Sequence, residues 1–358
     1  ALKDLALLYR NNLDVKVVGI TGSVGKTSTK ETISSVLSEK YRVLKTLGNF
    51  NNEIGLPLTV FRLTEDDEVA VLEMGISDFG EMDRLSKIAQ PDICVITNIG
   101  FCHLENLGTR DGILKAKTEI FNHMNPDGIV IVNGDDDKLS TISQVHGKRP
   151  LVFGISNKDG VYADNIKSLG LDGTSFTIHG IKTSDNYSTF DLTVPVPGHH
   201  MVYNAMAAAL VGSVLGLSSI EIERGVKNLK TIAGRNNIIK ENGFTIIDDC
   251  YNANPVSMKA SLDVLDTAIG RKVAILGSMF ELGENEKQMH YDVGMYLGTK
   301  DIDVLITAGD LAAQIAAGTR AYIDTNYNAH GCEVHDFETR DDMLKCIGHI
   351  LKTGDNIL

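Results

Sequence analysis

Tryptophan is absent from the 358 residues, and the five cysteines stand apart, at positions 94, 102, 250, 332 and 346. An odd number of cysteines without a C-x-x-C pair argues against a disulfide framework or a zinc site, and indicates reduced thiols in a cytoplasmic protein. No apolar run approaches the length of a membrane span, and the first residues lack the pattern of a signal peptide. Positive charge is also scarce, since the formal net charge is -13. This balance argues against general binding to nucleic acid or to anionic membranes.

The remaining composition, 43% hydrophobic and 23% charged, is that of an ordinary globular protein, and the length suggests two domains. Short apolar runs such as VKVVGI, EVAVLEM, DICVITNI, GIVIVN and PLVFGI suit strands that are buried on both faces of a parallel sheet. An amphipathic helix in ALKDLALLYRNNL precedes the first of them. The helices predicted between the strands span residues 27–39, 80–89, 111–123 and 137–145. This βαβ alternation is typical of an α/β fold.

The pattern changes twice further along the chain. Residues 161–196 alternate apolar and polar side chains between turn signals, which predicts antiparallel hairpins appended to the sheet. Two helices follow, in HHMVYNAMAAALVGSVLGL and at 219–229, and the α/β alternation restarts near 233 with FTIIDD, KVAILGS, DVLITAG and CEVHDF. We therefore predict a central domain with a mostly parallel sheet in residues 1–233 and a Rossmann-like α/β domain in residues 234–358.

The corner between the first strand and its helix reads TGSVGKT, residues 21–27, and is called the phosphate loop below. Glycines let backbone N–H groups turn toward phosphate oxygens, and the helix directs its positive end to the same place. Lysine adds a point charge, and a threonine hydroxyl can bind Mg²⁺. The alternative is an ordinary βα turn, because the first glycine of the strict P-loop pattern is replaced by Ile20. The predicted nucleotide-binding residues of this corner are Gly22, Ser23, Val24, Gly25, Lys26, Thr27 and Ser28.

Polar side chains also follow the next two strands. Glu73 ends a strand, where a carboxylate can hold a metal or orient water, or simply face solvent. Asn98 and His103 follow another strand and are either site or structural residues. Lys117 lies on the next helix, where the pattern alone predicts a solvated surface lysine.

Two further segments are rich in asparagine. Residues 46–60 form either a recognition loop or a plain polar loop. In the second half, Arg235 and the pair Asp248 and Asp249 suit contacts to nucleotide phosphate and ribose, or an interdomain salt bridge. The candidate substrate-binding residues are Asn49, Asn51, Asn52, Asn98, Asn252 and Asn254.

Taken in order, these segments resemble the Mur ligases, the ATP-dependent amide ligases of bacterial cell-wall synthesis. The resemblance is carried by TGSVGKTSTKE, GNFNNEIGLPLT, EMGISDFGEM, TNIGFCHLENLG, AKTEIF, YNAMAAAL, DDCYNANPVSM and LGSMFELGE, and it covers nearly the whole chain. Within the family, GNFNNEIGLPLT, DDCYNANP and LGSMFELGE look most like the branch that joins D-alanyl-D-alanine to a UDP-linked muramoyl tripeptide.

The resemblance implies a reaction. ATP would phosphorylate the tripeptide carboxylate, and the amine of the dipeptide would displace the phosphate to form an amide. Lys26 would hold the γ-phosphate, Thr27 and Glu73 a first Mg²⁺, and His103 with a carbamylated Lys117 a second. Outside this centre, Asn204 would contact adenine, and Arg235 and Asp249 would reach phosphate and ribose. The resemblance also implies a monomer that serves cell-wall biogenesis, cell shape and cell division.

Departures from the family pattern qualify these expectations. Met201 stands where an asparagine is common, which removes one expected adenine contact, and Ser278 stands where an aspartate is common. The family's UDP-sugar-binding N-terminal domain and basic C-terminal tail are not among these residues, so we expect the central and C-terminal domains only. The alternatives are another Mur-type ligase, a folylpolyglutamate synthetase-like ligase and a catalytically silent ATP-binding partner protein. The sequence leaves the third residue of the acceptor peptide undecided.

Overall fold

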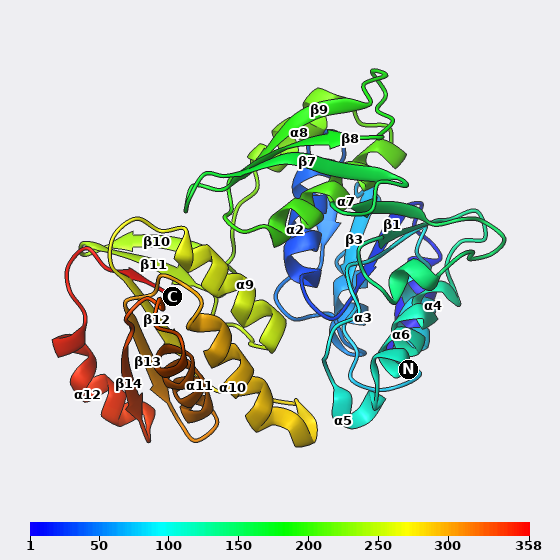
Figure 1. Ribbon diagram of the computed structural model, residues 1–358. Helices are drawn as coiled ribbons and strands as arrows, with labels where there is room; N and C mark the ends of the chain where they lie inside the picture. Colours follow the sequence, from blue (N-terminus) through cyan, green and yellow to red (C-terminus); the bar gives the residue numbers. More distant parts are fainter. The chain divides into compact units, whose positions relative to one another are not determined.

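The computed structural model describes all 358 residues, which form two compact units (Figure 1). The first unit comprises residues 1–167, 174–195 and 200–230, and the second comprises 168–173, 196–199 and 231–358. Each unit is built around its own sheet, so the predicted α/β class is confirmed. We had placed the domain boundary at 233, and the longest segment of the second unit begins at Thr231.

The first unit contains a nine-stranded sheet in the order β2-β3-β1-β4-β5-β6-β7-β8-β9. The strands from β2 to β7 pair in parallel, and β8 and β9 pair antiparallel. The predicted hairpin region thus extends the same sheet at one edge. The strands are β1 Lys16–Thr21, β2 Val43–Lys45, β3 Val69–Glu73, β4 Ile93–Ile96, β5 Ile129–Asn133, β6 Leu151–Gly154, β7 Val161–Ser168, β8 Thr174–His179 and β9 Thr189–Val194.

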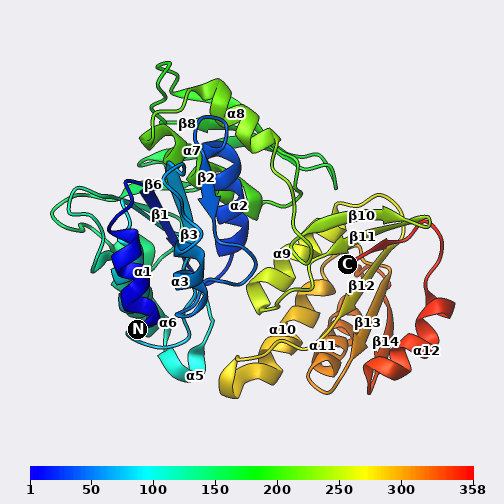
Figure 2. The ribbon, with the colours of Figure 1, turned by 180° about the vertical axis from the view of Figure 1, so that it is seen from behind.

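Helices cover both faces of this sheet (Figures 1 and 2). Helices α2, α7 and α8 pack against one another on one face, whereas α1, α3, α4 and α6 lie on the other. Because each central strand is sandwiched, its side chains are buried on both faces, as its apolar sequence predicts. The helices are α1 Leu2–Arg10, α2 Lys26–Leu37, α3 Gly55–Val60, α4 Glu81–Ala89, α5 Leu104–Leu107, α6 Arg110–Thr118, α7 His200–Val214 and α8 Ser219–Lys227, with 3₁₀ turns η1 Glu119–Phe121 and η2 Leu139–Thr141.

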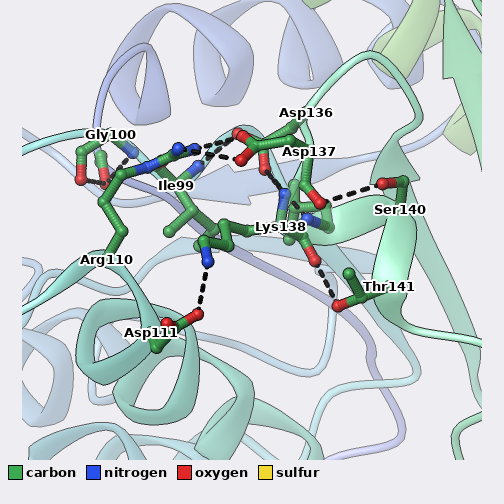
Figure 3. Close-up of polar contacts among 11 residues, drawn as sticks. Ile99, Gly100, Arg110, Asp111, Asp136, Asp137, Lys138, Ser140 and Thr141 are labelled. Atoms are coloured by element: carbon green, nitrogen blue, oxygen red, sulfur yellow. Dashed lines mark hydrogen bonds and ion pairs between the residues drawn. The ribbon is translucent and has the colours of Figure 1, made fainter.

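The helix predicted at residues 137–145 is wrong, because only the short turn η2 forms there. The Asp136 carboxylate accepts hydrogen bonds from the N–H groups of residues 138 and 139. The hydroxyls of Ser140 and Thr141 donate back to the carbonyls of Asp137 and Lys138 (Figure 3). Such local side-chain bonds compete with a helical ladder and favour a turn.

The second unit has a six-stranded sheet in the order β10-β11-β15-β12-β13-β14, in which only β10 runs antiparallel to its neighbour. Helices α9, α10 and α11 cover one face and α12 the other. No helix of either unit is both long and apolar enough to cross a bilayer. The elements are β10 Asn237–Glu241, β11 Phe244–Asp248, α9 Pro255–Asp266, β12 Lys272–Leu276, η3 Gly283–Asn285, α10 Glu286–Leu297, β13 Val304–Ala308, α11 Ala312–Thr325, β14 Glu333–Phe337, α12 Arg340–Ile350 and β15 Asn356–Ile357.

Candidate nucleotide and metal site

Strands β3, β1 and β4 are neighbours and run in parallel, so the segments that follow them meet at one edge of the first sheet. The phosphate loop follows β1, and α2 begins at Lys26. Gly22 has φ 148°, and a Cβ there would lie 1.9 Å from Thr97 Oγ1. Gly25 caps α2 with φ 81°, in the left-handed region that glycine tolerates best. Both glycines are therefore required by the backbone itself.

The segment after β4 lies against the phosphate loop. The Ser23 N–H donates to the Asn98 carbonyl at 3.0 Å. The Asn98 side chain bonds both polar groups of Val24, with its Oδ1 accepting from the Val24 N–H and its Nδ2 donating to the Val24 carbonyl, each at 2.9 Å. The Asn98 amide therefore shapes the phosphate loop, and the substrate contact that the sequence indicates for Asn98 stays a prediction.

Lys26 places its charge inside the same loop. Its amine donates to the carbonyls of Gly22 at 2.9 Å and Ser23 at 3.4 Å. The following residue, Thr27, is 8% exposed and donates from Oγ1 to Glu73 Oε1 at 3.2 Å. A cation, a helix N-terminus and a hydroxyl thus converge, which is the arrangement that binds phosphate together with Mg²⁺.

Glu73 is the buried carboxylate of this site, with an exposure of 2%. Its Oε1 accepts a second hydrogen bond from Asn51 Nδ2 at 2.8 Å. Its Oε2 is buried without a hydrogen bond, and the nearest cation is the Lys30 amine at 3.7 Å. A buried oxygen with unused lone pairs is a fitting ligand for the first Mg²⁺ that the family resemblance implies.

Lys30 was missed by the sequence analysis. It is 1% exposed and lies 3.1 Å from Glu31 Oε1, while Lys45 pairs with the other oxygen of Glu31. Lys30 follows Thr27 by three positions on α2, so both side chains lie on the same helix face. This three-residue spacing could have identified Lys30 from the sequence. A lysine on the same face of α2 as Thr27 lies near any carboxylate that Thr27 contacts.

Lys117 is 1% exposed, so the surface position that its pattern predicted is wrong. Burial, and then the charge of Lys26, lower the pKa of the Lys117 amine to about 7. His103 caps α5 in the left-handed conformation, with φ 51°. No three His, Cys, Asp or Glu side chains gather as a metal cluster anywhere in the chain. The residues present therefore fit the first Mg²⁺, through Glu73 and Thr27, more fully than the second.

The asparagines of residues 46–60 have different tasks. Asn51 holds Glu73, and its carbonyl also accepts from the Gly75 N–H at 2.8 Å. Asn52 Oδ1 accepts from the N–H groups of residues 54 and 55 at the start of α3. Asn49 is exposed. Of the three, only Asn51 touches the predicted metal ligand.

Asn204 on α7 lies beneath the phosphate loop. It is 6% exposed, and its Oδ1 accepts from Thr29 Oγ1 at 2.9 Å. Its Nδ2 faces the sulfur of Met201 at 3.3 Å, a weak acceptor. A Cβ on Gly25 would lie 3.6 Å from Asn204 Oδ1. The structure thus places Asn204 against the N-terminus of α2, with Met201 on its other side.

The second unit has polar groups of its own around a cavity of about 580 Å³. The guanidinium of Arg235 lies over the Tyr251 ring, 4.3 Å from its centroid. Asp249 accepts from the Asn236 N–H at 3.0 Å and from the Ser261 hydroxyl, and burial raises the pKa of its carboxyl. Residues that line the cavity include Asp248, Asp249, Tyr251, Asn252, Ser261 and Ser278.

The two predicted asparagines of this unit differ. Asn254 caps α9, because its Oδ1 accepts from the N–H groups of residues 256 and 257. Asn252 is exposed and lines the cavity. Asn252 is therefore the better placed of the two to contact a ligand.

Comparison with known proteins matches both units. Residues 20–212 match the model of the Mur ligase middle domain, and residues 234–358 match that of the Mur ligase, glutamate ligase domain. The chain is 40% identical, over all of its length and 75% of the relative, to the UDP-N-acetylmuramoyl-tripeptide–D-alanyl-D-alanine ligase of Bacillus subtilis. The ligase of the same name from Escherichia coli is 34% identical over 89% of this chain and 70% of its own.

Solved structures agree with these relatives. MurF from Acinetobacter baumannii superposes with a TM-score of 0.88 at 32% identity, covering 100% of this chain and 76% of its own. MurF from Thermotoga maritima, solved in complex with ADP, gives a TM-score of 0.84 at 30% identity, with coverage of 100% and 78%. A folylpolyglutamate synthase from Mycobacterium tuberculosis shares the fold, with a TM-score of 0.72 at 16% identity.

Proposed function

The chain belongs to the Mur ligase family, and from that premise we propose that it is the ATP-dependent ligase that adds D-alanyl-D-alanine to UDP-N-acetylmuramoyl-tripeptide. The bond formed is a carbon–nitrogen amide bond, and the products are the lengthened peptide, ADP and phosphate. The relatives with which it shares 40% and 34% identity carry this activity in their names. We place the reaction in the cytoplasmic part of peptidoglycan synthesis, which serves cell shape and division, and expect a monomer.

One observation carries the proposal, namely the meeting of Lys26, Thr27 and the unbonded Oε2 of Glu73 at one sheet edge. Lys26 and the loop N–H groups bind and orient the phosphates. Thr27 and Glu73 would hold Mg²⁺, which would supply charge neutralisation to the transferred phosphoryl group. Because phosphoryl transfer needs positioning and charge neutralisation more than covalent catalysis, these residue types support a role in the first half of the reaction.

We further propose that Lys117 carries a carbamate. The neutral amine attacks the carbon of CO₂, an N–C bond forms, and the amine loses a proton to solvent. A pKa of about 7 supports this step, because at pH 7 about half of the protein molecules then carry Lys117 as the neutral, nucleophilic amine. The product is an anion with two oxygens, which, with His103, suits a second Mg²⁺.

Isotopically labelled bicarbonate tests the carbamate by NMR. We expect a carbamate signal in the wild type that disappears in Lys117→Met and persists in Lys115→Met, an exposed lysine of the same helix. A signal that survives in Lys117→Met would place the carbamate elsewhere.

The remaining predicted contacts stay proposals. We assign Asn204, Arg235 and Asp249 to the nucleotide, and Asn49, Asn52 and Asn252 to the muramoyl peptide or the dipeptide, whereas Asn254 serves first as the cap of α9. The half-buried Arg235 beside Tyr251 and the cavity lined by Asn252 support these assignments in the second unit. Loss of nucleotide affinity in Arg235→Ala, with an unchanged melting temperature, is the expected result.

Nucleotide binding is tested by thermal denaturation with Mg²⁺ and ADP. A ligand that binds only the folded state stabilises it by about 2.7 kcal/mol at one hundred times its Kd. We expect this stabilisation in the wild type and in Lys16→Ala, whose side chain is 60% exposed, but not in Lys26→Ala. If ADP stabilised Lys26→Ala as much as the wild type, residues 21–27 would not be the phosphate-binding loop.

An assay of phosphate release distinguishes the candidate activities. Phosphate release that requires ATP, UDP-N-acetylmuramoyl-tripeptide and D-alanyl-D-alanine together supports the proposed ligase. Release that instead depends on a folate and glutamate, or on another amino acid, would favour a different ligase of this fold. Binding of ATP without release under any of these conditions would indicate a silent partner protein.

A further inference from the structure

The backbone of Ile99 is held on both of its polar groups by side chains from elsewhere. Its N–H donates to Asp136 Oδ2 at 2.8 Å, and its carbonyl accepts from Arg110 Nε at 2.9 Å (Figure 3). Asp136 follows β5, and Arg110 is the first residue of α6. A single residue of the segment after β4 is thus fixed on both sides, by a side chain that follows β5 and by one that begins α6.

Each of these two side chains is fixed in turn. The other oxygen of Asp136 accepts from the N–H groups of residues 138 and 139, at 2.9 Å each. The guanidinium of Arg110 forms a two-pronged pair with the Asp137 carboxylate. It also lies over the ring of Phe101, 5.6 Å from the centroid. We call Arg110, Asp136 and Asp137 the Ile99 clamp.

The opposite side of the clamped segment shapes the phosphate loop. Residue 98 bonds Ser23 and Val24, as described above. On the other side of Ile99, the Gly100 N–H donates to Ser23 Oγ at 2.9 Å. The residues immediately before and after Ile99 therefore both contact the phosphate loop, so any displacement of Ile99 moves the groups that hold Ser23 and Val24.

We propose that Arg110 and Asp136 are positioning residues for nucleotide binding, and that they act through Ile99 on the phosphate loop. This inference rests on the proposed nucleotide-binding role of that loop. Neither residue touches the loop, and neither is among the residues that the sequence motifs indicated. The role requires arginine in particular, because its planar fork serves the Ile99 carbonyl and both oxygens of Asp137 at once, whereas a lysine amine cannot.

The decisive measurement is amide hydrogen exchange at Ser23 and Val24 in the nucleotide-free protein. Loss of a hydrogen bond to a charged group changes a local opening equilibrium by about tenfold or more. We expect both amides to exchange at least about tenfold faster in Arg110→Lys and Asp136→Ala. The matched control is Arg224→Lys on α8. It alters an ion pair with Glu39, which follows the C-terminal end of α2, whereas the phosphate loop precedes the N-terminal end of that helix.

Kinetics provide the second readout. In both clamp variants the KM for ATP rises, because the loop that receives the phosphates is no longer held in position, while the KM for D-alanyl-D-alanine stays unchanged. Exchange at Ser23 and Val24 that equals the wild type in folded Arg110→Lys would overturn the proposal, as would an equal acceleration in Arg224→Lys. If Asp136→Ala fails to fold, Arg110→Lys and Asp137→Asn, which weakens one arm of the clamp, decide the question.

The test separates this inference from the proposed function. Faster exchange of the two amides supports the clamp even if the wild type does not bind ADP. If the wild type failed to bind ADP, the phosphate loop would have no nucleotide-binding role. Arg110 and Asp136 could then not be positioning residues for nucleotide binding.

Discussion

Asn51 donates a hydrogen bond of 2.8 Å to the buried Oε1 of Glu73, although Asn51 lies in the loop before α3 and Glu73 is the last residue of β3. The Gly75 N–H, two residues beyond Glu73, returns a bond to the Asn51 carbonyl at the same distance. The asparagine-rich segment is thereby attached to the end of β3 at two points. One oxygen of Glu73 is held by Thr27 and Asn51, which leaves the other, buried and without a hydrogen bond, as the candidate ligand.

Substitution of Asn51 by alanine is expected to weaken the binding of Mg²⁺. A hydrogen bond to a charged group contributes about 1.5–3 kcal/mol, which corresponds to a factor of roughly 10 to 100 in affinity. Half-maximal phosphate release should therefore need that much more Mg²⁺. The control is Asn12→Ala, which removes an exposed amide bonded only to the Leu8 carbonyl. An unchanged Mg²⁺ requirement in Asn51→Ala would contradict the role of Asn51.

Lys117 is expected to make stability depend on pH. Its amine has a pKa of about 7 in the folded protein, against an ordinary value of 10.5. Between these values the unfolded chain binds more protons than the folded one, so the free energy of unfolding rises with pH. A shift of this size corresponds to a few kcal/mol, since one pKa unit is worth about 1.4 kcal/mol. The penalty is fully present below pH 7 and disappears as the pH approaches 10.5.

Urea unfolding of the wild type and Lys117→Met, in CO₂-free buffer from pH 6.5 to 9.5, measures this effect. Lys117→Met removes the buried charge and should flatten the pH dependence, while Lys115→Met, on the exposed side of α6, should follow the wild type. Parallel curves for the wild type and Lys117→Met would show that the amine is not desolvated.

Alanine substitutions of Asn252 and Asn254 are expected to have different effects, one on substrate binding and the other on stability. Asn254→Ala removes the cap of α9 and should lower the free energy of unfolding by about 1 kcal/mol. Asn252→Ala should leave stability unchanged and raise the KM for D-alanyl-D-alanine, because this exposed side chain lines the cavity of the second unit. The reverse pattern would show that the two assignments are exchanged. Denaturant melts and steady-state kinetics on both variants provide the measurements.

Errors of the sequence-based prediction occurred where side chains bond to distant or unexpected partners. The pattern of residues 137–145 suits a helix, but the Asp136 carboxylate and two hydroxyls bond the backbone locally and stop it at one turn. Lys117 looks like a surface lysine from its polar neighbours, yet α6 turns it inward.

The sequence by itself determined the α/β class, the phosphate loop and the family. These depend on local patterns: the apolar runs of buried strands, the glycines that the turn requires, and motifs in a fixed order. Only the tertiary structure decided which polar groups meet. Lys30 reaches Glu73, and Arg110 reaches Ile99, because parallel strands bring the ends of separate segments to one edge of a sheet. Burial of the Lys117 amine lowers its pKa, since the cost of removing a charge from water depends on its surroundings and not on its neighbours in the chain.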